Sequence, residues 1–399
     1  MDLDVWANIP DHIIVNIFSN LSLSDRYHAS LVCKSWQTCF HSQYLWRKFV
    51  FNLNQYDVIF QNFKECILQH GRHFRNVSII LYQKDEEKRQ CAIEVINQMA
   101  KIKKCNLQKF AICFTGENPL FYAGLEFVDA LKTLFGPAPA DLSPKGSLVE
   151  VDLSGIQAAF DDTLINQLSD NHPEIKYLNL FNSILVCKVT ANCILRLVQR
   201  CKKLRDLRVY HTSISDEVLE TLAEDDRSPI QYLAIGCRRE IKYETDLTSD
   251  AWHKLVEKVP DLRVSLHFDH TCPLPKVADV LKPEIPLKQL RLETFTILIE
   301  EIRNVASFYC DTLETLVIQT RNSQELGAAL LNVAHTCKLL KCLKVYCILD
   351  KEVVDGILKE LPQLKENGNY ILKSEMESEP WMIPTRQGLL TIQQQFPYK

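Results

Sequence analysis

The stretch LRDLRVY, residues 204–210, decides the fold, because its arrangement of apolar and polar residues returns along most of the chain. Apolar residues occupy its first, fourth and sixth positions. The last two of them alternate with polar residues, and this alternation predicts a short β-strand with one buried face. The first apolar residue lies at the bend that leads into the strand.

The pattern apolar-x-x-apolar-x-apolar recurs from residue 74 onward, mostly at intervals of about 25 to 33 residues. Its copies start at Phe74, Leu107, Leu148, Ile175, Leu204, Ile230, Leu287, Leu313 and Leu340, with a degenerate copy at Leu262. Between the copies the apolar spacing becomes helical. Helices are predicted at 91–102, 124–135, 191–198, 215–222, 249–259, 323–334 and 351–361.

One strand and one helix cannot bury their own apolar faces, so neighbouring units must stack. Stacking predicts a curved α/β solenoid with strands on the concave face and helices on the convex face. This arrangement resembles the leucine-rich-repeat horseshoe. Cys201, Cys310 and Cys337, each three residues before a first apolar position, resemble the cysteine-containing class of such repeats. Several copies lack the asparagine or cysteine usual after the strand, which leaves the repeat boundaries open.

Residues 5–50 have no repeat signal but show three helical patterns, at 11–20, 24–33 and 34–40. This segment holds more apolar side chains than so short a module can bury. They are Ile13, Ile14, Ile17, Phe18, Leu21, Leu23, Leu31, Val32, Trp36, Leu45 and Trp46. The surplus indicates an external partner.

These residues resemble the F-box. The matching positions are Ile9-Pro10, Ile17-Phe18, Leu21, Asp25-Arg26, Val32-Cys33, Trp36 and Leu45-Trp46. An amino-terminal F-box followed by leucine-rich repeats resembles the substrate receptors of SCF-type ubiquitin ligases. Within that family, residues 116–124 and 379–381 resemble one subfamily, while residues 25–46 also resemble the cryptochrome-binding members.

The resemblance implies that the F-box helices bind a Skp-type adaptor and, through it, a cullin-RING ligase. The adaptor contacts that it implies are Pro10, Ile13, Ile14, Ile17, Phe18, Leu21, Val32 and Trp36. The alternative is that these residues only cap the first repeat. Trp46 and Phe49 fit that capping role better.

The concave face is expected to bind an unidentified protein substrate, because side chains that alternate with the buried ones point into the hollow. Tyrosine and arginine are frequent in interface hot spots. The candidates are Tyr177, Phe181, Asp206, Arg208, Tyr210, Tyr232, Arg291 and Tyr346, with Trp381 in the tail. The alternative is that such residues are ordinary solvated strand positions. Trp381 is either a carboxy-terminal cap or a substrate contact.

Charge and motifs exclude several other functions. The net charge of −4 argues against a nucleic-acid partner. The acidic amino terminus and the lack of any long apolar run argue against export and a membrane, so the cytoplasm or nucleus is expected, with reduced cysteines. Residues 267–272 could ligate a metal, but no second ligand pair supports such a site. No catalytic residue, metal or cofactor is expected.

The sequence thus predicts an F-box at 5–50, a solenoid at 51–373 and a tail at 374–399, with a proline-rich loop at 136–147. Two further functions stay open. One is a catalytic ligase with a cysteine nucleophile, although no cysteine has an activating context. The other is an interaction scaffold that uses the F-box without target degradation.

Overall fold

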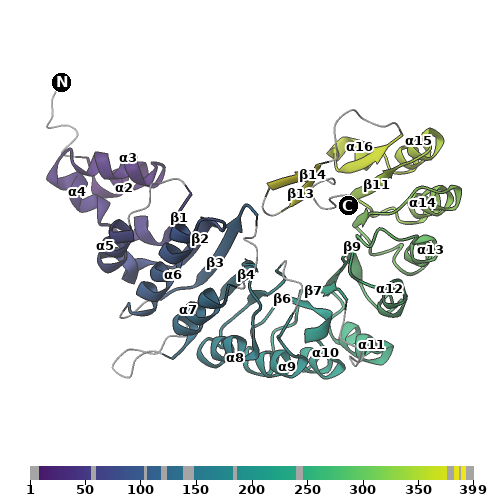
Figure 1. Cartoon of the computed structure of the whole chain (residues 1–399), viewed down its shortest axis with the longest axis horizontal. Helices are drawn as coiled ribbons and strands as arrows, with labels where there is room; N and C mark the ends of the chain where they lie inside the picture. Colours follow the sequence, from purple (N-terminus) through teal and green to yellow (C-terminus); the bar gives the residue numbers. More distant parts are fainter. Residues whose placement is uncertain are drawn as a thin grey trace. The chain divides into compact units, whose positions relative to one another are not determined.

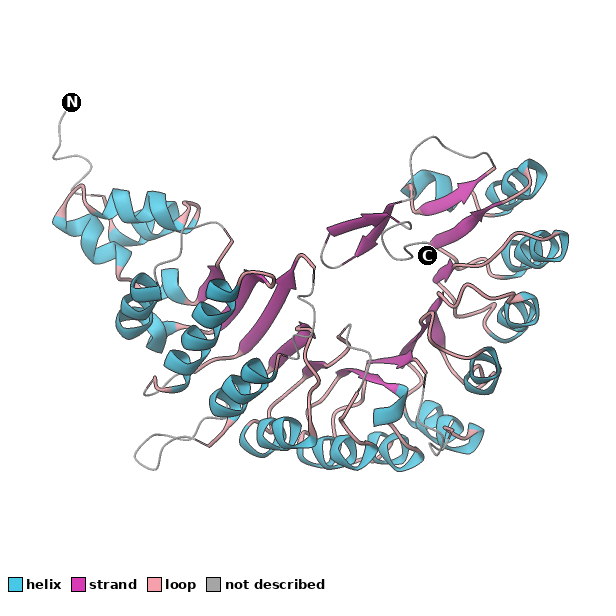
Figure 2. Ribbon diagram, viewed as in Figure 1, coloured by secondary structure: helices cyan, strands magenta, loops and turns pink. Residues whose placement is uncertain are grey.

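The computed structural model describes residues 9–54, 60–102, 106–117, 124–137, 148–182, 187–239, 246–374, 382–385 and 388–391. The chain divides into two compact units, Met1–Ala158 and Ala159–Lys399. Each unit is built from parallel strands that alternate with helices (Figures 1 and 2).

The first unit begins with a helical module and continues as three strand-helix repeats closed by a fourth strand. The module contains α2 (Asp11–Ser19), α3 (Leu23–Ser30), α4 (Lys34–Phe40) and the 3₁₀-helix η1 (Gln43–Trp46). The parallel strands are β1 (Lys48–Asn52), β2 (Asn76–Tyr82), β3 (Lys109–Thr115) and β4 (Glu150–Gly155). Between them lie α5 (Phe60–His70), η2 (Gly71–His73), α6 (Glu86–Ala100) and α7 (Leu125–Phe135).

The second unit is a parallel sheet lined by helices on one side. Its strands are β5 (Tyr177–Asn179), β6 (Asp206–Tyr210), β7 (Tyr232–Cys237), β8 (Arg263–Phe268), β9 (Leu287–Leu292), β10 (Thr315–Ile318), β11 (Cys342–Ile348) and β12 (Tyr370–Lys373). Its helices are α8 (Asp162–Asn171), α9 (Ala191–Arg200), η3 (His211–Ser213), α10 (Asp216–Leu222), α11 (Ser249–Lys258), α12 (Leu274–Val280), α13 (Ile299–Phe308), α14 (Gln324–Thr336), α15 (Lys351–Glu360) and α16 (Gln363–Asn367). An antiparallel hairpin, β13 (Met382–Thr385) and β14 (Gly388–Thr391), follows.

Within the second unit the strands line the inner side of an arc and the helices its outer side (Figure 1). The core lies between these layers and consists of the repeated apolar positions. Leu204 and Leu207 are fully buried, and Val209 is almost so. Neighbouring copies stack in register, with Leu207 opposite Leu178 on one side and Leu233 on the other. The predicted α/β solenoid is therefore confirmed.

The copy at Leu262 departs from the regular pattern, as its degenerate sequence indicates. Strand β8 places Val264, Leu266 and Phe268 in the core, with Ser265 also buried and His267 partly exposed. One residue fewer separates Leu262 from the strand than in the other copies, so the alternation begins earlier. His267 consequently faces the concave side, opposite Arg291 of β9.

Two of the outer helices are tied to the preceding helix by the same contact, which we call the Thr–Asp clasp. Thr190 caps α9 and donates from its backbone nitrogen (2.8 Å) and from Oγ1 (2.7 Å) to Asp162 of α8. Thr248 caps α11 and binds Asp216 of α10 in the same way, at 2.9 and 2.7 Å. The cap of α11 is thus Thr248, one residue before the start of the predicted helix.

The predicted helices at 91–102, 124–135, 191–198, 215–222, 249–259, 323–334 and 351–361 correspond to α6, α7, α9, α10, α11, α14 and α15. Helix α6 begins at Glu86, because Asp85 caps it by accepting bonds from the backbone nitrogens of Glu87 and Lys88. Most of the predicted loop at 136–147 lies outside the described residues. Within the described chain no helix is long and apolar enough to cross a membrane.

Candidate functional site

The amino-terminal helical module is held together by two polar side chains of its motif. Ser22 caps α3 by accepting from the backbone nitrogen of Asp25 at 3.1 Å, and its hydroxyl donates to the Asp25 carboxylate at 2.7 Å. Arg26 donates to the carbonyl oxygens of Phe18 (3.0 Å), Leu45 (3.2 Å) and Leu21 (3.3 Å). The guanidinium therefore joins the end of α2 to η1 and sets the angle between the helices.

Two pairs of aliphatic side chains of this module are exposed. Ile13 and Ile17 are 44% and 40% exposed and, being four residues apart, share one face of α2. Leu31 and Val32 are 62% and 59% exposed in the turn between α3 and α4. Leu31 is absent from the predicted contacts, although it lies beside Val32. Exposed apolar pairs of this kind indicate a protein-binding surface.

Two predicted adaptor contacts are corrected by their burial. Ile14 is 1% exposed and Phe18 is fully buried. Both face the interior of the helical module, where the Phe18 ring meets Trp36 edge to face at 5.6 Å. Trp36 and Leu21 are half-buried, and Pro10 is exposed. The available surface thus consists of Pro10, Ile13, Ile17 and Val32 with Leu31 added, and partner contact by these residues stays a prediction.

Trp46 and Phe49 pack onto the first repeat, as expected for a cap. Their rings stack at 5.7 Å, and Phe49 stacks in turn on Phe74 at 5.1 Å. The Trp46 ring also lies flat against His70 at 3.7 Å. Burial there lowers the pKa of His70 to about 4, helped by the neighbouring His41. These four rings close the amino-terminal end of the sheet of the first unit.

On the first strands of the second unit, the concave face carries an arginine stacked between two tyrosines. Arg208 of β6 lies 5.1 Å from the ring centre of Tyr177 on β5 and 4.9 Å from that of Tyr232 on β7. Asp206 fixes the guanidinium with two hydrogen bonds of 2.9 Å, which raise the pKa of Arg208 above its usual value. The three planar groups therefore form one rigid surface across neighbouring strands.

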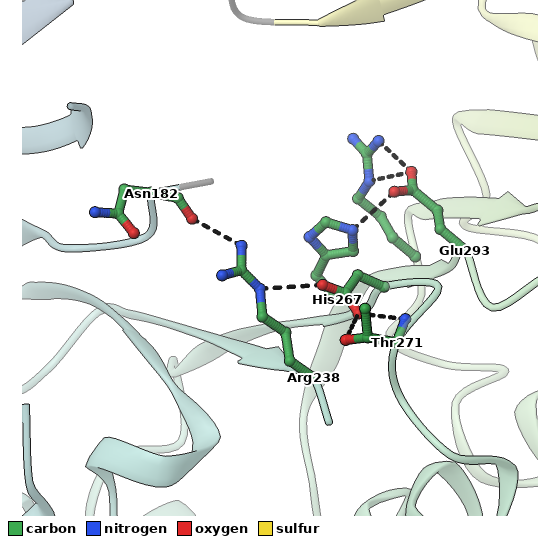
Figure 3. A network of polar contacts seen from close by, with 7 residues as sticks. Asn182, Arg238, His267, Thr271 and Glu293 are labelled. Atoms are coloured by element: carbon green, nitrogen blue, oxygen red, sulfur yellow. Dashed lines mark hydrogen bonds and ion pairs between the residues drawn. The ribbon is translucent and has the colours of Figure 1, made fainter. Parts of the chain in front are cut away.

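Arg238, just after β7, connects the ends of three repeats (Figure 3). Its Nη2 donates to the carbonyl oxygen of Asn182 at 2.8 Å, and its Nε pairs with Asp269 at 3.0 Å. The guanidinium lies over the Tyr210 ring at 4.1 Å. Asp269 also accepts from the backbone nitrogen (2.8 Å) and hydroxyl (2.6 Å) of Thr271.

A second network joins β8 to β9 (Figure 3). His267 Nε2 donates to Glu293 Oε2 at 2.8 Å, and Arg291 binds Glu293 Oε1 through Nε at 3.0 Å and also through Nη2. Burial opposes ionisation of Glu293, but His267 and Arg291 outweigh it and hold the pKa of this carboxyl at about 2. Glu293 is therefore charged at neutral pH and neutralises Arg291.

Phe181 spans the space between these groups. Its ring centre lies 5.1 Å from that of Tyr210 and 5.5 Å from that of His267. It passes directly over Gly236, where an added Cβ would come within 1.7 Å of the ring. The absence of a side chain at Gly236 thus lets the aromatic ring lie flat on the strand.

Two of the predicted substrate contacts are not available on the surface. Tyr210 is 4% exposed because Arg238 and Phe181 cover it. Tyr346 is 9% exposed because it packs with Val317 and Ile371. Trp381 lies outside the described residues. Tyr177, Phe181, Asp206, Arg208, Tyr232 and Arg291 are partly exposed on the concave face, where substrate binding stays a prediction.

Besides the predicted substrate contacts, this surface contains Glu293, which the alternation places there, and Arg238, His267 and Asp269, which the structure adds. The alternation in β9 indicates Glu293 as a concave residue, and the correct register of β8 would have indicated His267 and Asp269. Arg238 follows its strand and no pattern marks it. Among the described residues no three histidine, cysteine or acidic side chains gather as metal ligands. In the 267–272 segment, His267 and Asp269 bind the side chains given above.

A helical module with exposed apolar side chains, followed by strand-helix repeats with a polar and aromatic concave face, defines a class of protein. A family model described as F-box-like matches residues 6–52. The matched residues contain the helical module and strand β1, and F-box/LRR-repeat proteins are similar to the chain over most of its length.

The chain is similar to F-box/LRR-repeat protein 8 of Homo sapiens, with 29% identity over 375 residues that cover 94% of this chain and 96% of the relative. The Mus musculus protein 8 is 28% identical over 377 residues, 94% of this chain and 97% of its own. F-box/LRR-repeat protein 21 of Bos taurus is 27% identical over 350 residues, 85% of this chain and 76% of its own. The subfamily whose likeness was predicted is that of F-box/LRR-repeat protein 8, and these relatives confirm it.

Proposed function

We propose that this chain is the substrate-recognition subunit of an SCF-type ubiquitin ligase, composed of a Skp adaptor, a cullin and the F-box protein. The F-box helices bind the adaptor, and the concave face of the repeats captures a target protein for ubiquitination. The chain itself forms and breaks no bonds. It raises the effective concentration of a target lysine near the charged conjugating enzyme.

The observation that carries this proposal is the coincidence of the F-box-like match with exposed apolar side chains. Residues 6–52 match the family, and within them Ile13, Ile17, Leu31 and Val32 present apolar surface to solvent. Isolated exposed apolar residues are common, but two pairs within one short helical module indicate a partner helix. F-box and leucine-rich-repeat proteins are in general receptor subunits rather than enzymes.

The adaptor contact is tested with the double variant Ile13→Glu and Ile17→Glu in the full chain. Both side chains are exposed, so the helices remain folded, whereas a charge at the buried Phe18 would unfold the module. We expect a loss of about 2 kcal/mol or more in adaptor binding, roughly thirtyfold in Kd. Binding is measured by calorimetry with the purified adaptor, after the melting temperature has shown that the variant is folded.

Leu68→Glu is the matched control, because Leu68 is 71% exposed on α5, outside the F-box helices. This variant should bind the adaptor like the unmodified chain. Wild-type affinity in the folded Ile13/Ile17 variant would contradict the adaptor site. Normal binding by the Leu68 variant then separates a specific loss from a general effect of added charge.

Target capture is tested separately with Tyr177→Ala and Tyr232→Ala. These substitutions remove the two rings that enclose Arg208 but leave the F-box unchanged. We expect proteins that accumulate on the chain under cullin inhibition to be lost, while recovery of the adaptor stays constant. Quantitative mass spectrometry of the purified complexes measures both. Equal target recovery from the variant would move the binding site away from this face.

A further inference from the structure

Three arginines of the concave face have a carboxylate partner from the same face: Arg208 in β6, Arg238 just after β7, and Arg291 in β9. Asp206 neutralises Arg208, Asp269 neutralises Arg238, and Glu293 neutralises Arg291. The pairs at Arg208 and Arg238 have closest nitrogen-oxygen distances of 2.9 and 3.0 Å, and Arg291 makes two contacts with Glu293. The face is therefore rich in guanidinium groups but low in net charge.

A phosphate group bound at any of these arginines would meet the paired carboxylate. The guanidinium edges that bind phosphate in a bidentate manner are occupied by Asp206 in β6 and by Glu293 in β9. A dianion placed there would stand within a few ångströms of a like charge, which costs free energy in a partly buried site. Neutralised arginines thus select against a phosphorylated ligand.

Arg263 at the start of β8 and Lys344 in β11 form no ion pair with a described acidic side chain. Three strand spacings separate them, about 14 Å at the usual distance between neighbouring strands. One phosphate group cannot bridge that gap, since both donors would have to lie within about 3 Å of its oxygens. These two cations therefore do not form a joint phosphate site.

What the face does offer is flat apolar and planar surface. Tyr177, Tyr232 and Phe181 are partly exposed, and each is held by contacts to Arg208 or His267. Rigid aromatic rings and paired guanidinium planes bind aromatic and aliphatic side chains with little loss of conformational entropy. An uncharged partner matches this surface, because its binding leaves each ion pair intact.

We propose that the concave face of β5–β9 binds an unphosphorylated protein segment that presents aromatic or aliphatic side chains. This inference rests on the proposed function and specifies its substrate class. Asp206, Asp269 and Glu293 act as internal counter-ions that exclude phosphorylated segments. Binding at this face therefore does not require prior phosphorylation of the target.

The test uses the full chain in complex with its adaptor and an immobilised library of random-sequence peptides made in matched pairs. One member of each pair carries serine, threonine or tyrosine, and the other carries the phosphorylated residue. We expect the retained peptides to be rich in aromatic and aliphatic residues, with no preference for the phosphorylated member. Tyr177→Ala with Tyr232→Ala should abolish retention.

Asp206→Asn and Glu293→Gln test the role of the counter-ions. Each should shift the ratio of phosphorylated to unphosphorylated peptide upward by about fivefold, as expected for one released surface charge. Asp250→Asn is the control, because Asp250 pairs with Lys254 within helix α11 of the outer layer. This variant should leave the ratio unchanged.

Three results would overturn the proposal. The first is a preference of the wild-type chain for phosphorylated peptides by about tenfold. The second is a ratio of phosphorylated to unphosphorylated peptide that stays unchanged in both counter-ion variants. The third is peptide retention by the wild-type chain that does not exceed retention by the tyrosine double variant. None of these results depends on the F-box, since the peptides bind the concave face and the adaptor takes no part in that binding. Loss of the proposed receptor role would instead appear as a failure of the adaptor titration.

Discussion

At the residue scale, the ring of Phe181 leaves room only for glycine at position 236. An alanine Cβ there would lie 1.7 Å from the ring, so the Gly236→Ala variant must displace Phe181 from Tyr210 and His267. We expect a loss of about 1–3 kcal/mol in unfolding free energy, measured by chemical denaturation. In a Phe181→Ala background the same glycine substitution should cost much less, and equal costs in both backgrounds would exclude the ring contact as the cause.

Glu293 gives the second prediction at this scale, which concerns pH. Its folded-state pKa of about 2 lies below the ordinary 4.5, so the carboxylate stabilises the fold above pH 4.5 and this contribution is lost as the pH falls towards 2. The contribution amounts to at most about 3 kcal/mol. The Glu293→Gln variant should therefore be less stable than the unmodified chain at pH 6, and this difference should shrink progressively below pH 4.5. Denaturation midpoints across this pH range measure it, with Glu300→Gln, an exposed acid of α13, as the control.

Residue burial also shows what the sequence could and could not predict about the site. Alternation along β6 and β11 correctly assigns Arg208 to the concave side and Leu343 to the core. It cannot predict that Arg238, which follows β7, covers Tyr210, or that Val317 covers Tyr346. Burial on the concave side depends on contacts between repeats, and a local pattern does not contain them.

At the scale of elements, the Thr–Asp clasp gives a third prediction. Thr190→Ala removes both the cap of α9 and the bond from its hydroxyl to Asp162, and should cost about 1–2 kcal/mol. Asp162→Ala should cost a similar amount, and the double variant should cost less than the sum, because the two side chains share one contact. Unfolding free energies of the four proteins measure this coupling. Strict additivity would mean that the clasp does not link the helices.

The elements were predictable where the repeat spacing was regular. Strands β9, β10 and β11 follow the pattern without exception, since in each the two core residues stand three and five positions after the first apolar residue. Helices α5, α8, α12, α13 and α16 were not predicted; α12 has only seven residues, about two turns, with a proline near its start. The copy at Leu262 is degenerate because its first core residue of the strand, Val264, follows after two residues rather than three.

At the scale of the whole molecule, the F-box and the first repeat share a strand. The predicted boundary after residue 50 cuts through β1, which pairs with β2 along its full length. A chain that begins at residue 51 also loses Trp46 and Phe49, two rings of the amino-terminal cap. We expect it to melt several degrees below a chain that begins at residue 43, at about 2–4 °C per kcal/mol lost. Equal melting temperatures in scanning calorimetry would show that the first repeat needs no cap.

The internal neutralisation of the concave arginines has a kinetic consequence. A face whose charges cancel in pairs projects a weak long-range field, so encounter with a target is not steered, and salt changes its rate little. Association then proceeds at an ordinary rate of about 10⁵–10⁶ M⁻¹s⁻¹. Targets are then distinguished by their dissociation rates rather than by their association rates. Under the proposed receptor function, modification of a captured protein would depend on its residence time on the face relative to the time that ubiquitin transfer needs.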